Sequence, residues 1–192
     1  MPAAILLLTA LAAAGEPPRI SASVSVEDSW NDVFVHTPQF AAGAAFWVRD
    51  WASIELHGSW GPRSADATLR PLMINLQEQM VEPDVADIRG ILTAEAHLQP
   101  LSAQVGPLES TLGVFLGAGA LRSQMPAWLE NWYDEDPDEL SPVLRYGAEG
   151  GLWRDDLGLR LQLAQTRYTE ESAGLELHRD HLWVGVGLQW RR

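Results

Sequence analysis

Strict alternation of side-chain character constrains the fold of this chain more than any other feature. Residues 52–60 read ASIELHGSW and residues 92–99 read LTAEAHLQ, and apolar and polar side chains alternate along both. Successive side chains of a strand point to opposite faces, so each segment predicts a strand with two chemically different faces. The pattern recurs in six further segments: 20–26, 40–48, 111–120, 144–153, 157–163 and 182–190.

The polar faces of these segments combine many glycines with a few charged and imidazole side chains. Such a face suits the narrow lumen of an eight-stranded barrel, and an apolar exterior then requires lipid. We therefore predict an all-β fold, an eight-stranded antiparallel up-and-down transmembrane β-barrel. The expected polar network of the lumen consists of Glu55, His57, Glu95, His97, Arg145, Glu149 and Arg160.

The connections between these strands alternate in length. Short turns are expected at 49–51 and 154–156, and long connections at 27–38, 61–90, 122–142 and 167–180. Outer-membrane barrels have short periplasmic turns and long extracellular loops, so this rhythm predicts an outer-membrane location with both termini in the periplasm. The connection 100–109 is longer than this rule expects.

Tryptophan is abundant, with nine residues in the chain. Several lie at the ends of predicted strands, where membrane barrels carry girdles of aromatic side chains. The alternative is that they are ordinary buried residues. The predicted girdle consists of Trp30, Trp47, Trp51, Trp60, Trp153 and Trp190.

The first residues resemble an export signal. Residues 3–14 read AAILLLTALAAA, a short apolar run that ends in small residues, although no Lys or Arg precedes it. We predict a signal peptide over 1–14 and a single barrel domain over 15–192. The chain has no cysteine, which excludes disulfides and a lipid-modified cysteine. Its net charge of -13 argues against nucleic acid as a partner.

Two residue sets have side chains suited to chemistry. The pairs Glu55-x-His57 and Glu95-x-His97 would share the lumen face of neighbouring strands and can bind zinc or cobalt, but an ion-paired plug is the simpler interpretation. His57 and Ser59 are similar to the catalytic pair of outer-membrane lipid A deacylases. In those enzymes the pair faces the lipid, whereas here it shares the predicted lumen face with Glu55, so we expect no enzyme. We also expect no metal and no cofactor.

Two predicted loops carry features that can contact a partner. The acidic stretch 127–140 (AWLENWYDEDPDEL) does not have the spacing of an EF-hand and reads as a solvated acidic loop. Within loop 61–90, Leu72, Leu76 and Met80 are spaced by four residues, which indicates a short helix between 68 and 85.

Three segments carry a family resemblance: residues 30–60, the glycine-rich TLGVFLGAGA of 111–120, and the ending WVGVGLQW of 183–190. Together they resemble the outer-membrane β-barrel domain family of myxobacteria and related deltaproteobacteria. The resemblance implies architecture and location, and it permits a place in an envelope assembly such as gliding machinery. Arg191 and Arg192 depart from it, because outer-membrane barrels usually end on an aromatic residue.

The resulting hypothesis is a non-enzymatic barrel in contact with outer-membrane lipid and lipopolysaccharide. Its role is structural, or it binds an envelope partner through loop 127–140 or loop 61–90. The alternatives are a lipid-modifying hydrolase that uses His57 and Ser59, a small pore, and a soluble periplasmic lipocalin-like barrel.

Overall fold

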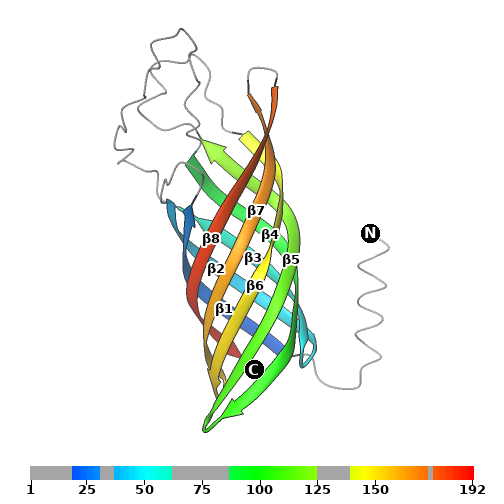
Figure 1. Cartoon of the computed structure of the whole chain (residues 1–192), viewed down its shortest axis with the longest axis vertical. Helices are drawn as coiled ribbons and strands as arrows, with labels where there is room; N and C mark the ends of the chain where they lie inside the picture. The colour runs from blue at the N-terminus through cyan, green and yellow to red at the C-terminus, as the bar shows by residue number, and fades with distance from the viewer. Residues whose placement is uncertain (1–18, 31–36, 62–86, 125–138, 173–174) are drawn as a thin grey trace.

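The computed structural model describes residues 19–30, 37–61, 87–124, 139–172 and 175–192, which form a closed barrel of eight antiparallel strands (Figure 1). Each strand pairs with its neighbours in chain order, and β8 closes on β1. This confirms the predicted fold class. The strands are β1 (Arg19–Trp30), β2 (Thr37–Arg49), β3 (Ala52–Trp60), β4 (Asp87–Val105), β5 (Leu108–Gln124), β6 (Glu139–Arg154), β7 (Leu157–Ser172) and β8 (Leu175–Arg191).

The strands are strongly staggered around the barrel. The ladder of paired residues that starts at Ile20 passes through β2 to β8 and returns to β1 at Trp30, so one circuit moves 30 − 20 = 10 residues along the strand. A stagger of this size goes with the strand tilt of roughly 35–45° that is typical of small barrels.

Side chains alternate between the lumen and the outside, as the sequence pattern predicts. In β3, Ser53, Glu55, His57 and Ser59 are buried, whereas Leu56 between them is exposed. Exposed apolar side chains occur on all eight strands. The polar faces therefore point inward throughout the barrel.

Strand ends differ from two sequence predictions. The segment 100–109 is not a long connection, because β4 continues to Val105 and β5 starts at Leu108 after a turn in which Gly106 has φ +62°. Likewise, β7 extends to Ser172 and β8 begins at Leu175, so most of the predicted loop 167–180 is paired strand. The segment 167–180 is rich in polar residues, and the alternation rule does not recognise strands that are polar on both faces. Residues 101–105 (LSAQV) do alternate, but Pro100 separates them from the predicted strand that ends at Gln99.

The turns at residues 50–51, 106–107 and 155–156 lie at the same end of the barrel as Arg19 and Arg191, and this end is called the turn end. The opposite end is called the loop end. The predicted signal peptide, the helix in 68–85 and nearly all of the acidic stretch 127–140 lie outside the described residues. Within the described ranges, no helix is long and apolar enough to cross a membrane.

Candidate functional site: the charged lumen

Arg160 on β7 is the centre of one charge cluster in the lumen. Its Nη1 donates to both oxygens of Glu55, at 2.9 and 2.8 Å, and its Nε and Nη2 donate to Glu149 Oε2 at 2.9 and 2.7 Å. All three side chains are buried. Arg160 thus joins β7 to β3 across the barrel and to β6 beside it. A guanidinium that holds two carboxylates in this way satisfies charges that would otherwise be costly to bury.

Arg145 on β6 organises a second cluster. Its Nη1 donates to Glu95 on β4 at 2.8 Å, and its Nη2 donates to Glu27 on β1 at 3.0 Å. The guanidinium also lies 5.2 Å from the centre of the Phe115 ring, which breaks the polar face of β5. Thr93 donates a hydrogen bond to the same Glu95 oxygen. The Phe115 ring therefore makes a cation–π contact with the buried Arg145 guanidinium.

Two imidazoles connect these clusters. His97 faces Glu149 with Nδ1 at 3.0 Å and Glu95 with Nε2 at 3.3 Å, and its ring stacks on Phe115. His57 Nε2 lies 3.4 Å from Glu27. Both rings are buried. The result is one continuous network of four carboxylates, two guanidinium groups and two imidazoles, and it contains all seven residues predicted for the lumen.

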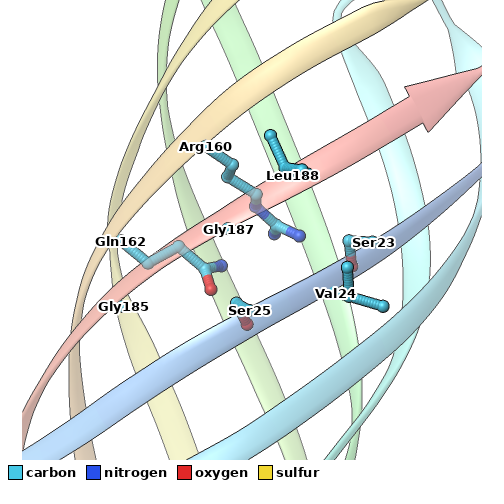
Figure 2. Close-up of a pocket in the computed structure, with 8 residues that line it drawn as sticks. All are labelled: Ser23, Val24, Ser25, Arg160, Gln162, Gly185, Gly187 and Leu188. Carbon is cyan, nitrogen blue, oxygen red and sulfur yellow. The ribbon is translucent and has the colours of Figure 1, made fainter.

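The wall beside Arg160 is built from very small side chains. Figure 2 shows Arg160 and Gln162 of β7 pointing across Gly185 and Gly187 of β8 toward the serines of β1. A Cβ on Gly187 would come within 2.5 Å of the Ser25 side chain and of the Val24 carbonyl. The space lined by these residues is too narrow for a water molecule. Glycine here lets the long side chains cross the lumen.

Bulky side chains close the lumen at both ends of the network. Toward the loop end, a buried apolar cluster fills the barrel, and Trp183 Nε1 donates to Thr166 at 2.9 Å within it. Toward the turn end, Trp47 Nε1 donates to Ser21 at 2.9 Å, and Trp153 is buried beneath Arg191. The apolar cluster consists of Ile91, Phe115, Leu121, Val143, Ala164, Tyr168 and Trp183.

The predicted aromatic girdle is therefore wrong in two positions. Trp47 and Trp153 point into the lumen, because each has the same parity as the polar face of its strand. Trp51, Trp60 and Trp190 lie on the outer face and are about half exposed, at 51%, 54% and 44%. The side chain of Trp30 lies outside the described residues.

The two residue sets suited to metal binding or catalysis are engaged in other contacts. The carboxylates of Glu55 and Glu95 are bound by arginines, and the part of the chain that the structure describes contains no group of three or more ligands placed to hold a metal ion. Ser59 Oγ donates to Gln39 at 2.7 Å, and His57 faces Glu27. Both residues lie in the lumen, so His57 and Ser59 are not presented to an acyl chain outside.

Two members of the network, Glu27 and Gln99, are not among the seven lumen residues predicted from sequence. Glu27 falls in the predicted connection 27–38, although it continues the inward face of Ser21, Ser23 and Ser25 by the same two-residue step. Gln99 Nε2 donates to Glu149 at 2.7 Å from the end of the predicted fourth strand. Extending the alternation by one residue would have found Glu27.

The outer face is the chemical inverse of the lumen. Leu159, Leu161 and Leu163 on β7 are 40–51% exposed, and Leu188 on β8 is 52% exposed. The exposed charged side chains of the described ranges gather at the two ends of the barrel and leave an apolar band between them. They are Arg19, Arg49, Asp50, Arg154, Asp155, Asp156 and Arg192 at the turn end, and Arg122, Arg167 and Asp180 toward the loop end.

The fold is similar to that of solved outer-membrane barrels. The N-terminal β-barrel domain of Pseudomonas aeruginosa OprF has a TM-score of 0.57 and 7% identity, over 91% of this chain and 97% of that chain. Neisserial surface protein A has a TM-score of 0.51 and 9% identity, over 90% and 96%. No protein-family model and no curated protein sequence matches. The chain therefore has the fold of a small eight-stranded outer-membrane β-barrel.

Proposed function

We propose that this chain is an integral barrel of a Gram-negative outer membrane, with a structural or partner-binding role in the cell envelope. One observation carries the proposal: apolar side chains point outward on all eight strands, while glutamates and arginines fill the interior. In water this arrangement would leave a large apolar area exposed, at a free-energy cost of about 25 cal/mol per Å². Such a band requires membrane hydrocarbon, and in this proposal outer-membrane lipid and lipopolysaccharide are the partners that supply it.

The filled lumen supports a role that does not involve transport. Arg145 and Arg160 span the interior through ion pairs, and Trp183 and Trp153 lie beyond them toward the two ends. A solute path would have to break these contacts. The surfaces at the two ends are then the parts that act, and the turn end faces the periplasm, where short turns belong.

The resemblance to the myxobacterial barrel family supports a narrower version of this proposal. A barrel with a closed lumen can serve as an outer-membrane anchor of an envelope-spanning assembly such as gliding machinery. The loops 61–90 and 127–140 are candidate contacts with such an assembly.

Fractionation of the cell envelope tests the proposal. We expect the protein in the outer-membrane fraction, with faster electrophoretic migration when the sample is not boiled, because barrels stay folded in detergent. Recovery as a soluble periplasmic protein without heat-modifiable migration would contradict it. Lipid A that is altered by the intact protein but not by a Ser59→Ala variant would instead identify a lipid-modifying hydrolase.

A further inference from the structure

Among the strands that the structure describes, one edge remains open at the turn end. β3 pairs with β4 only as far as Ala52 opposite Leu98, and the last contact is a hydrogen bond of 2.7 Å from Gln99 N to Trp51 O. β4 nevertheless continues to Val105, paired on its other side with β5. Among the described residues, no strand lies beside β4 from Leu101 to Val105 on the β3 side. We call this stretch the β4 edge.

The stagger of the barrel explains why this edge exists. From β4 through β8 and on to β3, neighbouring strands end nearly level with each other along the ladder. After one circuit of the barrel the ladder of paired residues returns to β1 ten residues further along. Strand ends that stay level along this ladder therefore form a spiral rim, and the two ends of the spiral meet in one step. The step falls between β3 and β4. Figure 1 shows the green β4–β5 hairpin reaching beyond the other turns.

The hairpin projects well past the Asp50–Trp51 turn. Strands rise about 3.3 Å per residue, so five residues at a tilt near 40° extend about 12 Å along the barrel axis. Residues 100–107 are exposed on both faces, with Leu101 at 61% and Val105 at 62%.

The chemistry of this hairpin differs from that of the other turns at the same end. Residues 98–108 read LQPLSAQVGPL and contain no charged side chain, in a chain with 26 acidic residues. The neighbouring turns carry Arg49 and Asp50, and Arg154, Asp155 and Asp156. Exposed strand edges are usually protected by charges, bulges or prolines. Here a register shift and Pro100 mark the start of the edge, and Gly106 and Pro107 its end, which leaves Leu101–Val105 unprotected.

We propose that the β4 edge binds an extended, uncharged segment of a periplasmic protein, which adds as a strand beside Leu101–Val105 and continues the line of β3. This inference rests on the proposed function and names its periplasmic contact. The segment would run antiparallel to β4, as β3 does. Its backbone groups pair with the open edge, and its outward side chains lie beside Leu101, Ala103 and Val105.

Two other occupants fit the edge less well. Lipid cannot satisfy the backbone N–H and C=O groups of an open edge. A second copy of the barrel in the same membrane has the same orientation and strand tilt. Its edge would cross the first at roughly 70–90°, twice the tilt, instead of lying alongside it. A flexible extended segment from the periplasm has neither restriction.

Amide hydrogen exchange measured by NMR tests the proposal on the full barrel in phosphatidylcholine nanodiscs. The probe is the peptide Ac-KTVTVTVK-NH2, in which terminal lysines keep the uncharged pairing segment TVTVTV soluble. Its matched control, Ac-KTVTPTVK-NH2, cannot pair through its centre. At saturating probe, we expect exchange to slow by about tenfold or more at amides within Leu101–Val105 and to stay unchanged at the 155–156 turn. A spin label on the probe should broaden signals of the β4 edge first.

Variants of Ala103 separate edge binding from other effects. Ala103→Lys should abolish the slowing of amide exchange, because a lysine on a strand edge hinders the addition of another strand. Ala103→Ser should retain the slow exchange. Absence of protection by the probe overturns the proposal. Equal protection by both peptides, matched by their uptake into empty nanodiscs, overturns it in favour of a lipid-facing surface. Protection that needs no peptide and rises with the number of barrels per disc overturns it in favour of a second copy.

A photoreactive residue in place of Ala103 extends the test to cells, with the same residue in place of Asp155 as control. We expect cross-linking from position 103 to an extended, uncharged segment, and a synthetic peptide of that segment should reproduce the amide protection. A captured segment that does not reproduce it overturns the inference. Failure of outer-membrane fractionation contradicts the proposed function, whereas an outer-membrane barrel that binds no peptide contradicts this inference alone.

Discussion

Arg160 and Glu55 lie on opposite walls of the barrel, on β7 and β3, and Arg160 Nη1 binds both oxygens of that carboxylate at 2.8 and 2.9 Å. The strand order places four strand steps between β3 and β7 in either direction. This pair therefore fixes the barrel across its full width. Removal of one partner leaves a buried charge without compensation, which is far more costly than the net contribution of the pair.

Arg160→Ala is expected to destabilise the barrel strongly. Glu55 and Glu149 would both lose their guanidinium partner, at a cost of about 3–5 kcal/mol in the free energy of unfolding. Urea unfolding in lipid vesicles measures this change. Arg167→Ala breaks the exposed pair with Asp180 and serves as control, with no measurable change expected. Similar midpoints for both variants would contradict the importance of the lumen network.

Gly187→Ala should also destabilise the barrel, through steric overlap. The added methyl would meet Ser25 and the Val24 carbonyl at 2.5 Å, and shifts of this kind cost about 1–3 kcal/mol. Gly150→Ala is the matched control, because its nearest neighbour is the Thr111 carbonyl at 3.7 Å. The same unfolding measurement compares the two. An equal effect at both positions would indicate that the seam between β1 and β8 has room to adjust.

Planar-bilayer recordings should show no conductance for the intact barrel. Ion pairs fill the lumen, and side chains of the described residues leave no water-sized space beside Arg160. Reconstitution must be verified by heat-modifiable migration of the same preparation. Discrete current steps from such a preparation would show that the lumen opens in a membrane.

Tryptophan fluorescence in brominated lipid distinguishes the two orientations of this side chain. Trp190 is 44% exposed on the outer face and Trp183 is 0% exposed inside. Trp190→Phe should lower the fraction of emission that bromine quenches, whereas Trp183→Phe should raise that fraction. The opposite ranking would mean that the lumen and the lipid face have been interchanged.

Arg191→Ala should weaken the turn end modestly. Arg191 Nη2 lies 2.6 Å from Glu109 Oε2, and the guanidinium lies 4.3 Å from the Trp153 ring, partly exposed. Contacts of this kind contribute about 0.5–1 kcal/mol each. Urea unfolding should separate it from Arg192→Ala, for which a smaller change is expected. The two terminal arginines thus differ, because Arg191 contacts Glu109 and Trp153 of the barrel wall. This contact is not expected from the aromatic residue with which outer-membrane barrels usually end.

Sequence pattern predicted the barrel because its physical cause is local. Successive residues of a strand face the lumen and the outside in turn, so polar and apolar side chains alternate, as Glu55 and Leu56 do. Partner choice across the lumen is not local. Nothing in the spacing indicates that Arg145 binds Glu27, 118 positions away, because that contact depends on the stagger of the closed barrel. The girdle prediction for Trp47 and Trp153 is wrong because it rests on their position at strand ends. The alternation along each strand places both side chains on the inward face.

The charges of the lumen are divided unequally along the chain. Strands β1 to β4 contribute Glu27, Glu55 and Glu95, whereas both arginines come from β6 and β7. The first half of the barrel is therefore anionic on its inner face until the second half arrives. A half-inserted chain would hold these charges against lipid without their counterions. Assembly is thus expected to be cooperative, with the N-terminal and C-terminal halves attracted to each other before the last seam closes.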